Sequence, residues 1–364
     1  MIGGDRSVLQ GKKSAFWYTL EEFSKHWDRI DVICPKVKNS RTKIQEPIHG
    51  NVYFHPSPKR LWYQPFWIYK KGKELHEKIK FDAMTVHEYP PFYNGIGARW
   101  LYKKTFIPYE LEIHHIVGYP KSASFFEYIG RLMSLFYLPI DAHTAAAVRT
   151  VNEKTKNQLE RWGIPGNKIQ VVPSFYLDRK LLSSIKDQPI KYDLATCARL
   201  VKNKGIEELI QAVKFLPELS LVIIGDGPEM RNIHNLVCKK GINNRVTLKG
   251  WLPTQKDVME TIKSARIFVM NSKSEGGPRI LLEAMAIGMP VISTPVGIVN
   301  DVISSNVNGV ISTGSAHNLS YKIKALMADE ALQKKIGKEA RKVMDKFDRS
   351  TLIKNYADFV KSLK

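Results

Sequence analysis

The chain has 364 residues, of which 43% are hydrophobic and 25% charged, so it is neither disordered nor collagen-like and is long enough for two globular domains. Its apolar runs are far shorter than the roughly 18 residues of a membrane-spanning helix, and we expect neither such a helix nor a signal peptide. The three cysteines, at 34, 197 and 238, are too far apart for a disulfide framework or a cysteine zinc site, so a cytoplasmic protein is expected.

The net charge of +21 is spread evenly: residues 1–188 hold 29 basic and 18 acidic groups, and the remainder holds 27 and 17. Proteins that bind nucleic acid concentrate such charge in one domain, tail or stripe, so we expect no nucleic-acid partner. The even spread favours phosphate-bearing ligands or an anionic membrane surface. A merely solvated surface is the alternative.

The first half alternates short apolar runs with helical or loop segments. Before the Gly3-Gly4-Asp5 turn stand only Met1 and Ile2, so the first strand is either very short or cut at its start. Further strands are predicted at 30–34, 52–54, 83–87, 108–113, 148–152 and 169–172.

Two helical segments of the first half are rich in aromatic residues. The segment from Lys59 to Lys80 mixes five aromatic residues with many lysines, so it can lie on an anionic membrane or pack on its own domain with its lysines in water. The second segment, 125–138, has apolar residues at positions 125, 129, 132 and 136. This helical spacing predicts that those residues face the core.

The second half predicts a doubly wound α/β domain. Pro189 interrupts a polar stretch at 184–191, which we interpret as a linker between domains 1–188 and 189–345, with a helix at about 346–364 packing back on the first. Strands are predicted at 193–197, 220–224, 245–248, 267–270 and 291–293. Helices are predicted at 206–215, from the turn at 225–228 to about residue 240, and through most of 320–364.

The segment from Ser274 to Val291 carries the strongest chemical signal. The glycines Gly276 and Gly277 allow close approach of a ligand to the backbone, and Pro278 pre-sets the first turn of a helix. Free amides from Arg279 to Leu281 at that helix start would stabilise an anion such as a diphosphate. Two carboxylates, Glu275 and Glu283, flank this site. The alternative is that these glutamates only stabilise the helix.

This segment resembles the signature of the retaining glycosyltransferases of family 4, the glycosyl transferases group 1. The resemblance lies in two glutamates separated by seven residues, Glu275 and Glu283, followed by Ala284-Met285-Ala286 and Pro290-Val291. It implies the GT-B fold, in which two facing doubly wound Rossmann-like α/β domains enclose a deep cleft. The first domain would bind the acceptor and the second a nucleotide-sugar donor.

The resemblance extends to the basic loop that holds Arg199 and Lys204. In the family these residues contact the donor diphosphate, a role that suits a bidentate guanidinium and a compact ammonium. A solvated basic loop is the alternative. The resemblance also implies that Glu283 holds the ribose and Glu275 the donor sugar.

Two further donor segments are weaker signals. The turn with Gly225 and Gly227 fits the family's strand-to-helix turn, but Met230 stands where a dinucleotide fingerprint has its third glycine. Trp251 and Leu252 match a segment near the nucleotide base. Trp251 would serve equally well in core packing.

In the first half the resemblance is fainter. Gly11, in the loop Gly11-Lys12-Lys13-Ser14, matches a loop that faces the donor, and His114 matches a histidine beside the donor sugar. A polar cap at a strand end is the alternative for His114. The segment 174–178 and Asn152 depart from the family pattern, which makes the acceptor side atypical.

Taken together, the resemblance implies a retaining transferase that moves a sugar from a UDP- or GDP-sugar to a hydroxyl of a polysaccharide or lipid-linked glycan. Front-face attack assisted by the leaving phosphate would need no carboxylate nucleophile. We expect no cofactor and no metal, and the sequence contains no D-x-D triplet. A cytoplasmic location, peripheral on the inner face of the membrane, is expected.

Two other classes of function remain open. The fold also serves nucleotide-sugar epimerases and phosphorylases. A basic protein that only binds nucleic acid or membrane would lack nucleotide-sugar turnover and bind polyanions in a salt-sensitive way.

Overall fold

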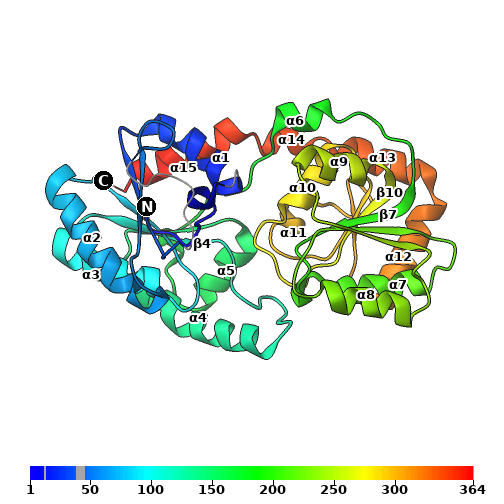
Figure 1. The fold of residues 1–364 in the computed structure, drawn as a ribbon, viewed down its shortest axis with the longest axis horizontal. Helices are drawn as coiled ribbons and strands as arrows, with labels where there is room; N and C mark the ends of the chain where they lie inside the picture. Colours follow the sequence, from blue (N-terminus) through cyan, green and yellow to red (C-terminus); the bar gives the residue numbers. More distant parts are fainter. Residues whose placement is uncertain (12–13, 38–45, 364) are drawn as a thin grey trace. The chain divides into compact units, whose positions relative to one another are not determined.

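The computed structural model describes residues 1–11, 14–37 and 46–363, which form two compact units (Figure 1). The first unit comprises residues 1–117, 129–174 and 349–364, and the second comprises 118–128 and 175–348. The boundary between the units, at residues 174 and 175, lies before the linker predicted at 184–191. The reason is that Leu177 pairs with the backbone at Asp348, and the ring of Phe175 lies 5.6 Å from that of Phe347. Residues 175–188 therefore pack with the second unit.

The first unit is built on parallel strands in two sheets, and all six of its predicted strands are confirmed. Ile2 forms parallel bridges to Ile33 in one sheet and to Val86 in the other, so the expected first strand is reduced to a bridge between them. The two-stranded sheet contains β1 (Ile30–Cys34) and β2 (Val52–Pro56); the other has the order β3 (Met84–His87), β4 (Tyr109–Ile113), β5 (Ala147–Thr150), β6 (Ile169–Val171).

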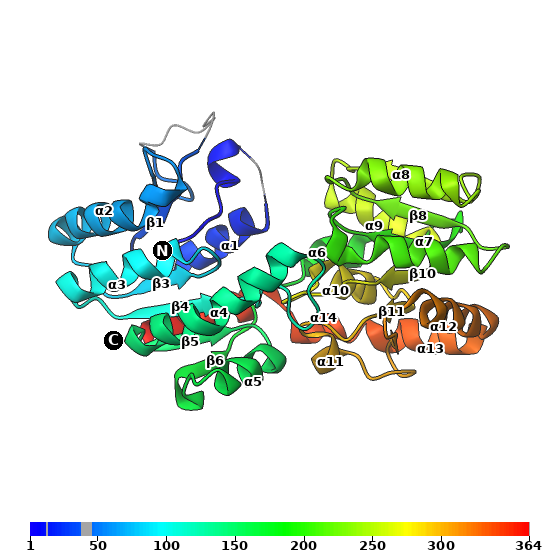
Figure 2. The ribbon, with the colours of Figure 1, turned by 90° about the horizontal axis from the view of Figure 1, so that it is seen from below.

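Helices cover these sheets (Figures 1 and 2). They are α1 (Ala15–Phe23), α2 (Gln64–Ile79), α3 (Tyr93–Thr105), α4 (Phe125–Thr144), α5 (Glu153–Arg161) and α15 (Arg349–Lys361). Helices α2, α3 and α4 lie side by side in both views. The last helix, α15, packs on α1, where Arg349 donates hydrogen bonds of 2.6 Å to Glu21 Oε2 and to the carbonyl of Tyr18.

The prediction that helix 125–138 turns its apolar residues to the core is wrong. Helix α4 exposes those residues, including Phe125 and Phe136, at 72% and 66% of their surface. Apart from Leu138, its buried side is small or polar, which allows close approach of Gly130 to Val117 and an ion pair of 2.8 Å between Asp141 and Arg99 of α3. The buried residues of α4 are Gly130, Ser134, Leu138, Asp141 and Ala142.

The second unit has one parallel sheet of six strands. The chain starts at β7, continues to β8 and β9 on one side, and then crosses to β10, so the strand order reverses between β7 and β10. In doubly wound sheets this is the switch point at which ligands bind. The order is β12 (Val310–Ile311), β11 (Val291–Ser293), β10 (Ala265–Met270), β7 (Tyr192–Cys197), β8 (Leu221–Ile224), β9 (Val246–Gly250).

The predicted strands of this unit are confirmed, whereas the two-residue β12 was too short to predict. A core that includes Leu194, Ile210 and Ile267 lies between sheet and helices. The predicted helical stretch 320–364 is confirmed. The helices are α6 (Arg179–Ser184), α7 (Ile206–Lys214), α8 (Met230–Lys239), α9 (Gln255–Lys263), α10 (Arg279–Ala286), α11 (Val299–Val302), α12 (Ala316–Ala328), α13 (Glu330–Ala340) and α14 (Val343–Lys346).

Within the described ranges, no helix combines the length and the apolar character needed to cross a bilayer.

Candidate functional site

Two loops meet at the switch point of the second sheet, one after β7 and one after β10. The structure brings together two predicted residues from these loops, because the ammonium of Lys204 forms an ion pair with the carboxylate of Glu275. The hydroxyl of Ser272 donates a second hydrogen bond of 2.9 Å to Glu275 Oε1. The side chains of Lys204 and Glu275 keep 18% and 19% of their surface accessible. A basic and an acidic group are thus poised together at the position where parallel sheets bind ligands.

Asn271 ties the two loops to each other. Its side-chain amide donates hydrogen bonds of 3.1 Å to the carbonyls of Gly205 and Gly314. Gly205 has φ +63°, and a Cβ there would overlap the carbonyl oxygen of Asn271, so glycine is required beside Lys204. Asn271 was not predicted from the sequence. Its signal was a polar residue directly after a buried strand.

Arg199 stands on the loop after β7 and is exposed. The loop is packed against the turn that contains Gly225 and Gly227. A Cβ at Gly225 would overlap the carbonyl oxygen of Ala198, and one at Gly227 would overlap that of Leu200. These two glycines therefore allow the Arg199 loop to lie close to the turn after β8.

The N-terminus of α10 follows the Glu275 loop directly. Pro278 occupies the N-cap position, and no side chain of the described residues caps this end. The first amides, from Arg279 and Ile280, thus lack a side-chain acceptor and carry the positive end of the helix dipole. The expectation that the amide of Leu281 is also free is wrong, because it donates a hydrogen bond of 3.0 Å to the carbonyl of Pro278. Gly277 lies against the ring of Phe175, where any Cβ would overlap the ring atoms. This end of α10 has the properties of an anion site.

Glu283 lies one turn into α10 and is 5% exposed. Its Oε1 accepts hydrogen bonds of 2.6 Å from Arg279 Nε and from Gln255 Nε2. Burial raises the pKa of Glu283 above its usual value, although Arg279 opposes the shift. The Arg279 guanidinium lies 5.2 Å from the centre of the Tyr176 ring. The hydrogen bond from Gln255 to this carboxylate could not be predicted, since α9 is remote from α10 in sequence.

Trp251 follows β9 and exposes 79% of its surface. The alternative that it packs in the core is therefore wrong. The neighbouring Leu252 is half-buried.

In the first unit, His114 follows β4 and is held by a buried network. Its Nε2 lies 3.1 Å from Glu112 Oε2, and Glu112 Oε1 lies 3.3 Å from the guanidinium of Arg149. The hydroxyl of Tyr356, on α15, also donates to Glu112, and the Arg149 guanidinium stacks 3.6 Å from the Tyr356 ring centre. This network was not predicted; its signal in the sequence is a pair of glutamates in an otherwise apolar strand.

Burial and charge set opposite pKa shifts in this network. Burial alone would raise the pKa of Glu112, but Arg149 and His114 hold it well below its usual value. Burial raises the pKa of the neighbouring Glu110 well above its usual value, and the charge of Glu112 adds to the effect. The ring of His87 lies 4.4 Å from that of His114, and burial lowers the pKa of His87 to about 3. Neutral His87 and ionised Glu112 therefore flank His114.

The remaining predicted residue of the first unit, Gly11, ends the short helix Val8–Gln10 in the left-handed region at φ +75°. Lys12 and Lys13 of the same loop lie outside the described residues. Asn152, where the family has serine, caps α5 by accepting a 2.8 Å hydrogen bond from the amide of Thr155. Asp178 caps α6 in the same way, from the amide of Leu181 at 2.9 Å.

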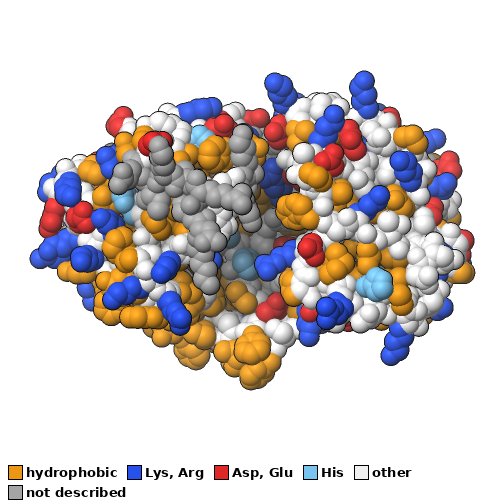
Figure 3. Space-filling model, in the orientation of Figure 1, with side chains coloured by type: hydrophobic (Ala, Val, Ile, Leu, Met, Phe, Trp, Pro, Cys, Tyr) orange, Lys and Arg blue, Asp and Glu red, His pale blue; other side chains and the backbone are white. Residues whose placement is uncertain are grey.

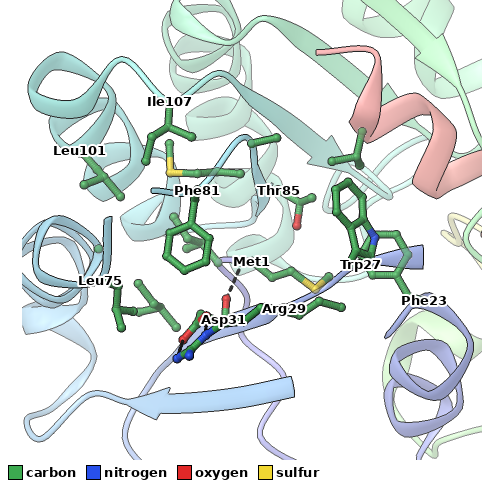
Figure 4. A pocket seen from close by; sticks show the side chains of 17 residues that line it. Met1, Phe23, Trp27, Arg29, Asp31, Leu75, Phe81, Thr85, Leu101 and Ile107 are labelled. Carbon is green, nitrogen blue, oxygen red and sulfur yellow. Dashed lines mark hydrogen bonds and ion pairs between the residues drawn. The ribbon is translucent and has the colours of Figure 1, made fainter. Parts of the chain in front are cut away.

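An apolar pocket also opens in the first unit, near β1 and β3 (Figure 4). Phe81, Leu75, Leu101 and Ile107 line it, and the side chains of Arg29 and Asp31 pair at one side at 2.8 Å. Its lining is mainly apolar, unlike the charged switch point of the second unit. Among the described residues, no group of three or more His, Cys, Asp or Glu side chains is arranged to hold a metal ion.

Two family models match the chain in succession. The model described as Glycosyltransferase Family 4 matches residues 16–176, and the model described as Glycosyl transferases group 1 matches residues 184–343.

Curated relatives match at lower identity. The lipopolysaccharide core biosynthesis glycosyltransferase LpsE of Rhizobium meliloti is 29% identical over 188 residues, which is 51% of this chain and 54% of that protein. The sulfoquinovosyl transferase SQD2 of Arabidopsis thaliana is 24% identical over 289 residues, which is 75% of this chain and 56% of that protein. The matches thus span only about half the length of these relatives.

Solved structures share the fold. Sucrose-phosphate synthase from Thermosynechococcus elongatus superimposes with a TM-score of 0.78 at 19% identity, over 95% of this chain and 91% of that one. HepE of Anabaena, solved with UDP and glucose, superimposes with a TM-score of 0.77 at 19% identity, over 99% and 98%. The two Rossmann-like α/β units therefore have the GT-B fold that the sequence predicted.

Proposed function

The chain belongs to the family 4 glycosyltransferases, and from this premise we propose that it transfers a sugar from a nucleotide-diphosphate donor to a hydroxyl acceptor. One observation carries the proposal: the paired Lys204 and Glu275 lie at the switch point, in the loops that lead to Arg199 and to the uncapped N-terminus of α10. Cations and free amides suit a diphosphate, and carboxylates suit sugar hydroxyls.

Each side chain then has a distinct task. Arg199 and Lys204 stabilise the leaving diphosphate together with the amides of α10. Glu275 orients the donor sugar. Glu283 accepts both of its described hydrogen bonds on Oε1, so its Oε2 is the atom we assign to a ribose hydroxyl.

Trp251 provides an exposed aromatic face for the nucleotide base. From the first unit, we assign His114 to the donor sugar, with Glu112 fixing the orientation of its ring.

The donor is a UDP- or GDP-sugar, and uridine is the base to test first because HepE was solved with UDP and with UDP-glucose. We propose that the acceptor is a polysaccharide or lipid-linked glycan, a class supported by the role in lipopolysaccharide core biosynthesis that the name of LpsE states.

The first experiment is calorimetric binding of UDP, GDP, ADP and CDP to the wild type and to the Arg199→Ala, Lys204→Ala double variant. One nucleotide should bind the wild type, and the double variant should bind it at least about tenfold more weakly. Lys202→Ala is the matched control, because Lys202 is exposed on the same loop. Equal binding by the double variant would refute the diphosphate assignment.

A second experiment addresses the reaction. Incubation with the nucleotide-sugar and a panel of glycan acceptors should yield a glycosylated product, whereas an epimerase would yield only an altered donor and a phosphorylase would need inorganic phosphate. We propose that the anomeric configuration is retained, which NMR of the early product checks. We also propose that the rate persists after treatment with EDTA, since side-chain cations would serve in place of a metal.

A further inference from the structure

Helix α4 is built with its apolar side outward. Four of its large side chains, Phe125, Phe126, Phe136 and Ile140, expose 72%, 86%, 66% and 51% of their surface. Ile129 and Leu132 are exposed between them, so the residues follow one face of the helix at intervals of three and four. Figure 3 shows hydrophobic side chains gathered over this helix. An apolar stripe of this length in water is unfavourable unless something covers it.

The inward side of α4 explains why the stripe points outward. It carries Gly130, whose nearest neighbour is the side chain of Val117, and Ser134, which donates a hydrogen bond of 2.8 Å to the carbonyl of Gly130. Asp141 is fully buried and pairs with Arg99. Rotating the helix to bury the aromatic side would expose these contacts and force large side chains into a space shaped for small ones. The orientation is therefore a property of the packed fold.

A second group of exposed aromatic and aliphatic side chains lies on the neighbouring helices. Leu61 and Trp62 precede α2, Phe66 lies on it, and the ring of Phe66 is 5.2 Å from that of Trp100 on α3. Phe92, at the start of α3, stacks on Tyr137 of α4 with ring centres 5.1 Å apart. Helices α2, α3 and α4 are thus consecutive members of one layer, as Figures 1 and 2 show.

The charge around this layer is positive. Between residues 59 and 144, eight of twelve basic side chains are exposed, against two of eight acidic ones. Lys59, Arg60 and Lys70 flank the aromatic group of α2, and Lys103 and Lys104 end α3. Lys121 lies just before α4. Two copies of this surface would oppose like charges, whereas an anionic surface would be attracted to it.

We propose that the outward face of α2, α3 and α4 binds the surface of an anionic phospholipid bilayer, with the apolar stripe of α4 entering the interfacial region. Aromatic side chains favour the headgroup level, and lysines beside them gain from anionic lipid. The sequence pattern left two alternatives for residues 59–80, membrane contact and packing on the domain. The structure adds α4, which the pattern had placed in the core. This inference uses no residue of the donor site and does not depend on the proposed function.

The test is co-sedimentation with vesicles of phosphatidylcholine alone and of phosphatidylcholine with an equal amount of phosphatidylglycerol. Wild-type protein should bind the anionic vesicles at low salt and bind less as salt is added. The Leu132→Ser, Phe136→Ser double variant should lose at least about tenfold in vesicle affinity, because two exposed apolar side chains no longer enter the bilayer. Tyr321→Ser is the matched control, since Tyr321 is 69% exposed on α12 of the second unit and lies outside the proposed surface.

A charge variant separates the electrostatic part of binding from the apolar part. Lys103→Gln with Lys104→Gln should reduce affinity for anionic vesicles about tenfold or more. Thermal unfolding and nucleotide binding should be unchanged in both double variants, which separates a failure of this surface from a failure of the donor site.

Absence of binding to anionic vesicles by the wild type would overturn the proposal, as would wild-type affinity in the Leu132→Ser, Phe136→Ser variant. A dimer in sedimentation equilibrium that this variant abolishes, without vesicle binding, would assign the surface to a second copy of the chain instead.

Discussion

The two sheets carry ionisable side chains at their carboxyl edges in opposite settings. In the second unit, Lys204 and Glu275 each keep nearly a fifth of their side-chain surface accessible, at 18% and 19%. In the first unit, Arg149 and Glu112 keep only 3% and 8%. An ion pair that solvent reaches can exchange partners with a ligand, whereas a buried pair cannot be broken cheaply and so fixes its neighbours. The pair at the second edge is therefore available to a ligand, whereas the pair at the first edge holds its neighbours in place.

The largest effect expected from this comparison is on stability. Arg149→Met should reduce the free energy of unfolding by about 3–5 kcal/mol, because Glu112 would be left buried without its cation. Guanidinium chloride unfolding would measure the loss. Arg161→Met, at an exposed position that ends α5, is the control and should change little. A loss of less than about 1 kcal/mol for Arg149→Met would mean that the network does not hold the first unit together.

The second-largest effect should be on the rate of sugar transfer rather than on stability. Lys204→Ala and Arg199→Ala should each slow transfer by roughly two to three powers of ten, since in the proposed function each residue supplies one electrostatic donor to the leaving group. Because the pair of Lys204 with Glu275 is accessible, Lys204→Ala should cost at most about 1 kcal/mol of stability. Steady-state kinetics beside thermal unfolding would check both, with Lys202→Ala as the control. Wild-type transfer rates in both variants would show that the accessible edge of the second unit takes no part in the reaction.

The third prediction concerns pH. Burial lowers the pKa of His87 to about 3. Below about pH 6.5, His87 is therefore protonated in the unfolded chain but stays neutral in the folded chain. Stability should therefore fall as the pH drops from about 6.5 toward 3, by at most about 1.4 kcal/mol per unit for this group.

Urea unfolding of the wild type and His87→Gln at several pH values would isolate this contribution. As the pH falls, the free energy of unfolding of the wild type should decrease relative to that of His87→Gln. A constant difference would show that His87 is not shielded from water.

The smallest effect concerns the caps of the helices. Asn152→Ala should cost about 1 kcal/mol, because the amide of Thr155 loses its acceptor, while Asn152→Ser should be nearly neutral. In the second unit Thr254 caps α9 similarly, and Thr254→Ala should cost a like amount. Thermal unfolding would compare the three variants. A large loss for Asn152→Ser would give Asn152 a role beyond capping.

Local patterns predicted most of the strands in both units and the chemically marked loops of the second. Strand β1 and strand β11 have the bounds expected from their apolar runs, because a buried parallel strand is apolar on both faces. Glu275 and Lys204 were each predicted as site residues from the sequence motif of the loop that contains them. Their pairing was implied by neither loop, since the residues are 71 positions apart.

Other features could not be predicted because they depend on partners remote in sequence. Tyr356 contacts Glu112 across 244 positions, and Gln255 contacts Glu283 across 28. The linker was expected at a polar segment containing proline, whereas the division follows the contact of Phe175 with Phe347. Such contacts leave no periodic trace in the chain.

What the sequence alone determined about this protein is its alternation of strands and helices, its family and the loops that carry charge, because these follow from local patterns of side chains. Only the tertiary structure decided which side of α4 is buried. Periodicity shows that a helix has an apolar stripe, but steric fit chooses the side that packs, and here the small residues and the Asp141 pair fit the unit better. The same holds for the two carboxyl edges, whose accessibility depends on neighbours that the chain brings together only on folding.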